Sequence, residues 1–155
     1  MNQTFENCTL LDTKTWFEKA VPEPTGKNFS TQLGVHLEEV AEMLQALEGR
    51  TPAVVHLLQD AISALDTLGE QCKADQNSVD VVDPLEMLDG ICDQIVTATG
   101  VAHMLGYDVV AAMTEVNASN FSKFDAEGQP IFNENQKIMK GPNYFKPDLA
   151  PYLPT

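Results

Sequence analysis

Residues 34–44 read GVHLEEVAEML and carry closely spaced glutamates on a segment with helical periodicity. At about 100° per residue, Glu39 and Glu42 lie within about 60° of each other, on a stripe beside a row of leucines. No Lys or Arg occurs between Lys27 and Arg50, so these acids have no basic partner on their own helix. Like charges on one helix face repel each other. The segment therefore predicts a helix on which something else must offset that repulsion.

A second acidic segment covers residues 86–96, which read EMLDGICDQIV. Glu86, Asp89 and Asp93 fall on one face of the expected helix, and the opposite face is apolar. The expected helix, residues 84–105, contains no Lys or Arg. This segment therefore repeats the arrangement of the first.

Two acidic stripes without basic partners predict a divalent cation site. Carboxylate oxygens are hard ligands that suit Mg²⁺, with Mn²⁺ as a second option. The alternative is a set of solvent-facing acids on an acidic protein, which we weigh lower because both helices are apolar elsewhere. The predicted metal ligands are Glu39, Glu42, Glu86, Asp89 and Asp93. Spacing alone leaves open whether the second pair is Glu86 with Asp89 or Asp89 with Asp93.

Helical spacing dominates the first 124 residues and predicts an all-α fold. Proline directly after a capping residue, at Thr51 and Asp83, predicts two helix starts. Gly106 predicts the end of the helix that begins at Asp83. The expected helices cover about residues 10–20, 28–48, 52–74, 84–105 and 108–123.

Residues 124–155 are rich in glycine and proline and predict an extended tail, with a short hairpin near residues 131–139. We expect this tail to lie over the helices or over a neighbouring subunit. The whole chain, residues 1–155, is predicted to be a single domain. Its architecture would be a bundle of four or five helices with a helical core of about residues 10–123.

The charge balance limits the classes of partner. Nine Lys and Arg against 23 Asp and Glu give a net charge of -14. Such a surface repels nucleic acid polymers and anionic membranes. No apolar run is long enough to span a membrane, and the three cysteines are scattered. We therefore expect a cytoplasmic protein.

Polar residues near the end of the last helix suit phosphate oxygens. Asn117, Asn120 and Lys123 recur every three residues, although a polar helix end with a lysine near the helix dipole would read the same way. The tail adds three lysines between residues 137 and 149, with aromatic side chains beside them. The predicted substrate-binding residues are Asn28, Gln32, Asn117, Asn120, Lys123, Lys140 and Tyr144.

The sequence lacks the motifs of several other common catalytic sites. No Glu is followed by His three residues later, as a di-iron carboxylate bundle requires. The sequence also lacks a glycine-rich phosphate loop and a Gly-x-Ser-x-Gly nucleophile elbow.

Taken together, these motifs resemble the MazG-like superfamily of all-α nucleoside triphosphate pyrophosphohydrolases, particularly the subgroup often met in bacteriophage genomes. The resemblance covers roughly residues 28–147. It is carried by EEVAE at 38–42, DGICD at 89–93, GYD at 106–108, EVNASNFSK at 115–123 and the KGPNY of the tail.

The resemblance implies a Mg²⁺-dependent enzyme that converts a nucleoside triphosphate to the monophosphate and pyrophosphate. It implies Glu39 and Glu42 as metal ligands, with Glu38 or Glu39 as the catalytic carboxylate that orients the attacking water. The family's second motif usually reads Glu-x-x-Asp. Glu86 and Asp89 have that spacing, but Asp93 lies at a better distance from the later motifs, and we favour Asp89 with Asp93.

Family members are dimers or tetramers, so the resemblance also implies a homodimer or homotetramer, in the host cytoplasm if a phage encodes the chain. Two alternatives stay open. One is a non-catalytic acidic helical module that binds a partner protein. The other is a phosphoribosyl-ATP pyrophosphohydrolase, which shares the chemistry.

Overall fold

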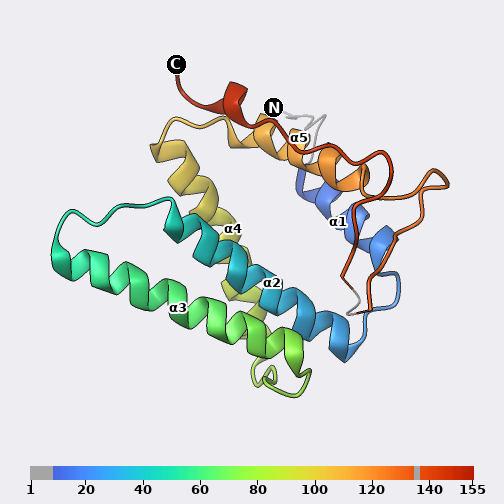
Figure 1. Ribbon diagram of the computed structural model, residues 1–155, viewed down its shortest axis with the longest axis horizontal. Coiled ribbons are helices and arrows are strands. Elements are labelled where there is room, and N and C mark those ends of the chain that lie inside the picture. Colours follow the sequence, from blue (N-terminus) through green and yellow to red (C-terminus); the bar gives the residue numbers. More distant parts are fainter. Residues whose placement is uncertain (1–8, 135–136) are drawn as a thin grey trace. The chain divides into compact units, whose positions relative to one another are not determined.

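The computed structural model describes residues 9–134 and 137–155 and is all-helical over them (Figure 1). Its helices are α1 (Thr9–Ala20), α2 (Gly26–Gln45), α3 (Pro52–Ala74), α4 (Pro84–Met104) and α5 (Val109–Phe121), followed by a short 3₁₀ helix, η1 (Ala150–Tyr152). The described residues contain no β-strand beyond one isolated bridge. The prediction of an all-α fold with four or five helices is confirmed, and the boundaries of the five expected helices differ by at most three residues.

Local capping chemistry explains these boundaries. Asp83 accepts hydrogen bonds from the amides of Leu85 (3.0 Å) and Glu86 (3.1 Å), and Pro84 follows at the first helical position. Gly106 ends α4 with a φ of 74°, in the left-handed region that favours glycine. Its amide and that of Tyr107 bond back to carbonyls of the last turn of α4.

The chain divides into two compact units. The hairpin unit is Glu23–Asp80 and contains α2 and α3. The terminal unit combines Met1–Pro22 with Val81–Thr155 and contains α1, α4, α5 and η1. The expectation of a single domain stays a prediction.

Small residues form the seam of the hairpin unit, where α2 and α3 lie side by side (Figure 1). The buried residues are Ser30, Gly34 and Ala41 on α2 and Gly69 and Cys72 on α3. The hydroxyl of Ser30 donates a hydrogen bond to the carbonyl of Cys72. A Cβ atom added at Gly34 would lie 2.5 Å from the carbonyl oxygen of Gly69, so the two backbones approach closely only because these positions are glycine.

Aromatic residues form the core of the terminal unit. Trp16 on α1 stacks on Phe124, with ring centroids 5.9 Å apart. The indole Nε1 of Trp16 donates to the carbonyl of Asn120 at 2.8 Å, which satisfies the polar end of the buried ring. The buried Ala20 completes this cluster.

The tail folds back along α5 of its own chain. Near the predicted hairpin, an antiparallel bridge joins Phe132 and Ile138, and the expected turn between them lies outside the described residues. Further on, the hydroxyl of Ser119 donates to the carbonyl of Phe145 at 2.8 Å, and the amide of Asp108 donates to the carbonyl of Tyr152 at 3.0 Å. Of the two expected positions, over the helices or over a neighbouring subunit, the structure shows the first.

The helix α4 differs from the other α-helices because none of its residues is buried. Its apolar side chains are widely exposed, as Leu85 (75%) and Met104 (84%) illustrate. Among the described helices, none is by itself long and apolar enough to cross a membrane. Only α4 and α5 taken as a pair pass that test, and they are bent by 119°.

Candidate functional site

The acidic motif of α2 divides into one paired and two solvent-facing carboxylates. Glu38 forms an ion pair with Lys73 of α3, and both side chains are about one-third exposed (30% and 33%). Glu39 and Glu42 are exposed and form no ion pair within the hairpin unit. The hairpin unit therefore presents two free carboxylates one helical turn apart.

Lys73 is a residue that sequence reasoning missed. It stands 35 positions from Glu38, so no helical period connects the two. The available signal was a glycine four residues before a charged residue in both helices, Gly34 before Glu38 and Gly69 before Lys73. Such a signal becomes readable only once α2 and α3 are known to pack against each other.

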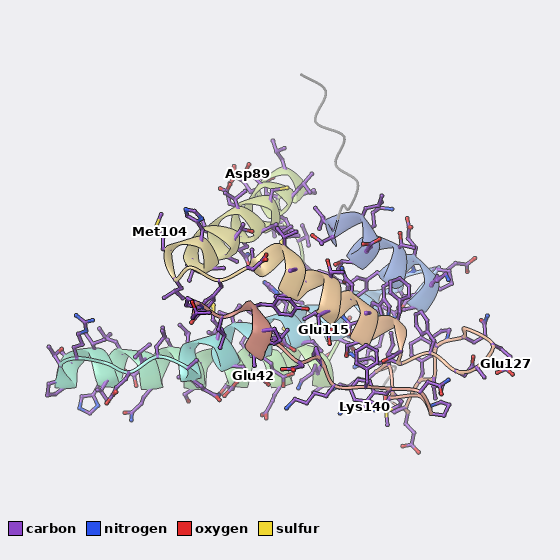
Figure 2. All side chains as sticks on the ribbon, turned by 90° about the horizontal axis from the view of Figure 1, so that it is seen from above. Glu42, Asp89, Met104, Glu115, Glu127 and Lys140 are labelled. Carbon is purple, nitrogen blue, oxygen red and sulfur yellow. The ribbon has the colours of Figure 1, made fainter. Side chains whose placement is uncertain are left out.

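The helix α4 carries the second acidic group in the terminal unit. Glu86, Asp89 and Asp93 are all exposed, and none forms an ion pair with another described residue of that unit. Glu86 lies in the first turn, where the positive end of the helix dipole favours a carboxylate. Figure 2 shows Asp89 on α4 and Glu42 on α2. The choice between Glu86 with Asp89 and Asp89 with Asp93 stays open.

Neither unit builds a complete metal site by itself. Over residues 9–134 and 137–155, no group of three or more His, Cys, Asp or Glu side chains is gathered closely enough to hold an ion. The predicted ligands divide between the hairpin unit and the terminal unit. The five-carboxylate ligand set accordingly stays a prediction.

The amide of Asn117 takes part in packing. The side chain is buried, donates to the carbonyl of Thr9 at 2.9 Å and accepts from the hydroxyl of Thr13 at 2.9 Å. These bonds fasten α1 to α5. The structure therefore gives Asn117 a packing role, and its contact with substrate stays a prediction.

Asn120 and Lys123 form a local pair at the end of α5. The Nζ atom of Lys123 donates to Oδ1 of Asn120 at 2.8 Å and lies 5.7 Å from the ring centroid of Trp16. Both side chains are partly exposed. This pair keeps an amide and an ammonium group together, as the predicted phosphate contact requires.

The remaining predicted substrate residues lie in different settings. Asn28 forms a capping box with Thr25 at the start of α2, whereas Gln32 is exposed one turn later. In the tail, Nζ of Lys140 lies 4.6 Å from the ring centroid of Tyr144. That these residues bind substrate stays a prediction.

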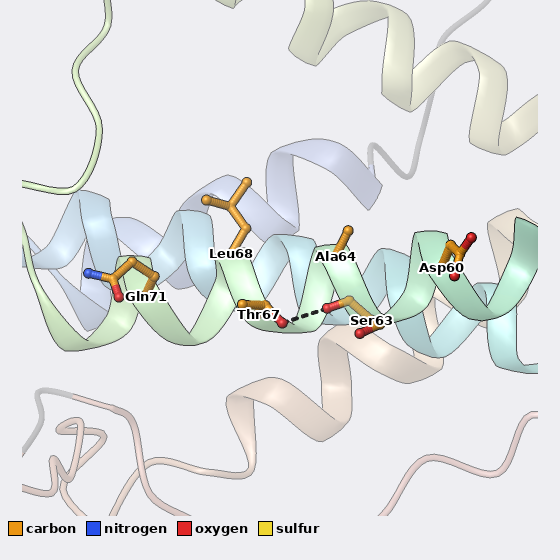
Figure 3. Close-up of a pocket in the computed structure, with 6 residues that line it drawn as sticks. All are labelled: Asp60, Ser63, Ala64, Thr67, Leu68 and Gln71. Atoms are coloured by element: carbon orange, nitrogen blue, oxygen red, sulfur yellow. Dashed lines mark hydrogen bonds between the residues drawn. The ribbon is translucent and has the colours of Figure 1, made fainter.

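A shallow pocket of about 510 Å³ follows one face of α3 (Figure 3). Its lining residues all belong to that helix: Asp60, Ser63, Ala64, Thr67, Leu68 and Gln71. The hydroxyl of Thr67 donates to the carbonyl of Ser63 at 2.7 Å, so it is bonded within the helix. The lining offers one carboxylate and no cation, and it contains none of the predicted site residues.

Comparison with known proteins gives one structural likeness. The fold is similar to that of a candidate NTP pyrophosphohydrolase from Exiguobacterium sp. 255-15, with a TM-score of 0.57. The alignment covers 91% of this chain and 89% of that chain at 21% identity. The two chains share a fold. No protein-family model and no curated protein matches the sequence.

Proposed function

We propose that this chain is a Mg²⁺-dependent nucleoside triphosphate pyrophosphohydrolase of the MazG-like superfamily and that it belongs to the phage-type subgroup. One observation carries the proposal. Two helices expose carboxylates that have no ion-pair partner among the described residues of their own unit, within a fold shared with a candidate NTP pyrophosphohydrolase. Acids without basic partners on ordered helices call for a cation to offset their repulsion.

The donor set fits a hard divalent ion. Glu39 and Glu42 supply carboxylate oxygens from α2, and Asp89 and Asp93 supply them from α4, with Glu86 as the alternative partner of Asp89. All five are exposed, so an ion can reach their oxygens from solvent. When bound, Mg²⁺, or Mn²⁺ in its place, would neutralise charge between these acids and the phosphate oxygens of the substrate.

The residues of the chain supply the remaining chemistry. Glu39 orients a water and accepts its proton as the water attacks the α-phosphorus in line. The bond from that phosphorus to the bridging oxygen breaks, which releases the monophosphate and pyrophosphate. Because Lys73 already engages Glu38, Glu39 is the better candidate of the two for this role. Most of the acceleration comes from positioning and charge neutralisation.

Basic and amide groups would hold the phosphates and the sugar. The pair of Asn120 and Lys123 keeps an ammonium group beside an amide. Lys140 beside Tyr144 combines a charge with an aromatic ring, which suits a nucleotide. In a chain of net charge -14, these lysines are a natural source of attraction for a triphosphate.

The test is release of pyrophosphate from the four common ribonucleoside and four deoxyribonucleoside triphosphates, with Mg²⁺ and then Mn²⁺. We expect turnover of at least one nucleotide, with loss of activity in EDTA. The control variant is Glu18→Gln, which alters an exposed acid outside the predicted site, on α1, where it pairs with Lys14. It should keep wild-type activity. Absence of pyrophosphate from all eight nucleotides with either metal would contradict the proposal.

A second candidate function follows from α4. A helix with no buried residue and exposed apolar side chains suits a non-catalytic module that binds a partner protein. A thermal melt with Mg²⁺ and a nucleotide separates the two functions, because a ligand of the folded state raises the midpoint. An unchanged midpoint would favour the module.

The same helix supports the proposed homodimer or homotetramer. Packing between copies would cover apolar side chains that the chain leaves exposed, such as Leu88 (60%) and Val96 (67%). Light scattering coupled to size-exclusion chromatography would measure the mass in solution. A mass of 17.0 kDa at micromolar concentration would contradict the oligomer.

A further inference from the structure

Four residues form a reciprocal arrangement where α2 and α3 lie against each other: Gly34 and Glu38 on α2, and Gly69 and Lys73 on α3. Each glycine stands four residues before the charged residue of its own helix and faces the charged residue of the other. A Cβ at Gly34 would lie 2.7 Å from Cγ of Lys73. A Cβ at Gly69 would lie 3.4 Å from Cγ of Glu38. The glycines thus make room for the stems of the two side chains that pair.

Lys73 is held in place on its own side as well. It lies in the last turn of α3, where a cation interacts favourably with the helix dipole. Its carbonyl accepts a hydrogen bond from Nζ of Lys27. The ammonium group of Lys73 therefore has a defined position, and its ion pair with Glu38 ties the acidic motif to α3.

The position of Glu38 matters because of its spacing from Glu42. Side chains four residues apart are neighbours on a helix surface. A freed Glu38 would therefore reach a cation bound at Glu42. Mg²⁺ requires near-octahedral coordination, and the proposed ligand set already includes two carboxylates from α2 besides those of α4. A third carboxylate from α2 would occupy a coordination position that the substrate needs.

We propose that Lys73 is a positioning residue for the acidic motif. It draws Glu38 toward α3, so that Glu39 and Glu42 are the two carboxylates of α2 that face the cation. The inference rests on the proposed function, because it concerns the same metal-binding carboxylates. It adds a residue of α3, outside both acidic motifs, to the machinery of the reaction.

The experiment compares Lys73→Met with Lys73→Arg and with Arg50→Met. Arg50 is exposed in the loop between α2 and α3, so its loss changes the net charge equally without touching Glu38. We expect Lys73→Met to bind Mn²⁺ about 3- to 10-fold more tightly, because Glu38 joins the ion, and to lose about tenfold in turnover. Lys73→Arg keeps the positive charge, so its Mn²⁺ affinity and its turnover should stay near the wild-type values. Arg50→Met should stay within about twofold of the wild type for both.

A double variant, Lys73→Met with Glu38→Gln, checks that the effect passes through Glu38. Its Mn²⁺ affinity should return to within about threefold of the wild type, because the carboxylate that Lys73 restrains is gone. Partly exposed ion pairs contribute little to stability, so circular dichroism should show wild-type helix content in each variant.

The outcomes separate the two proposals. If the wild type binds Mn²⁺ and releases pyrophosphate but Lys73→Met behaves like Arg50→Met, the inference fails and the proposed function stands. If Lys73→Met weakens Mn²⁺ binding and turnover together and lowers the melting midpoint, Lys73 is only structural and the inference fails. If the wild type neither binds Mn²⁺ nor releases pyrophosphate, both proposals fail.

Discussion

The hairpin unit and the terminal unit are held together by opposite kinds of side chain. In the hairpin unit, Gly34 and Gly69 bring two backbones together by the absence of side chains. In the terminal unit, Trp16 and Phe124 fill the core with stacked rings. The hairpin unit should therefore be sensitive to added atoms, and the terminal unit to removed ones.

The acids of the two units differ in the same instructive way. On α2, Glu38 has a cationic partner from α3, whereas no acid of α4 has one among the residues of its unit that the structure describes. The hairpin unit can therefore tune its carboxylates through a neighbour. The acids of α4 would instead depend on a bound cation to offset their mutual repulsion.

The largest expected effect is on activity. Glu42→Gln keeps the shape of the side chain and removes the charge that the cation requires, so we expect turnover to fall by about 1,000-fold, or ~4 kcal/mol in barrier height. Steady-state pyrophosphate release measures it. Glu48→Gln is the control, because Glu48 is exposed just beyond α2. Near-wild-type turnover in Glu42→Gln would remove Glu42 from the ligand set.

The next effect is on the stability of the terminal unit. Trp16→Ala empties a buried ring site and removes one donor to the carbonyl of Asn120, so we expect a loss of about 3–5 kcal/mol in the free energy of unfolding. Denaturant titration followed by circular dichroism measures it. Leu10→Ala, at a position 56% exposed, should cost under about 1 kcal/mol. Equal losses would contradict the assigned core.

Adding one methyl group should have opposite signs on two helices. Gly34→Ala places a Cβ 2.5 Å from the carbonyl oxygen of Gly69, so we expect destabilisation of about 1–3 kcal/mol. Gly90→Ala on α4 meets nothing within 4 Å and should stabilise by about 0.5–1 kcal/mol through helix propensity. Melting midpoints of both variants test the pair. A stabilising Gly34→Ala would refute the close seam.

The smallest effect concerns a helix cap. Asp83→Ala removes the acceptor for two amides at the start of α4, and we expect a loss of about 1 kcal/mol in the free energy of unfolding. Thr51→Ala removes the matching cap of α3, whose bond to the amide of Val54 is longer at 3.3 Å, and should cost less. Urea denaturation compares the two. A larger loss for Thr51→Ala would reverse the assigned order.

Sequence reasoning located the helices because their ends are set by local chemistry. Asp83 and Pro84 define the start of α4 from adjacent residues, and Gly106 defines its end by a single backbone preference. The position of Glu39 and Glu42 on one stripe beside the leucines follows from the helical period, whereas their exposure does not. Each of these signals lies within one or two helical turns.

The remainder required contacts between distant segments. The ion pair of Lys73 with Glu38 depends on how α2 packs on α3, and the burial of Asn117 depends on α1, more than 100 residues earlier. A polar residue on a helix has the same sequence signature whether it caps, packs or binds. Only tertiary structure distinguishes these roles.

The terminal unit is assembled from both ends of the chain, and this has a consequence for synthesis on the ribosome. Trp16 must wait for Asn120 and Phe124 to emerge, while α2 and α3 are already complete. At about 5–20 residues per second, that delay lasts several seconds, during which the amphipathic α1 has no docking surface. We expect the nascent chain to form its local hairpin first and to rely on transient protection of its N-terminal helix until translation ends.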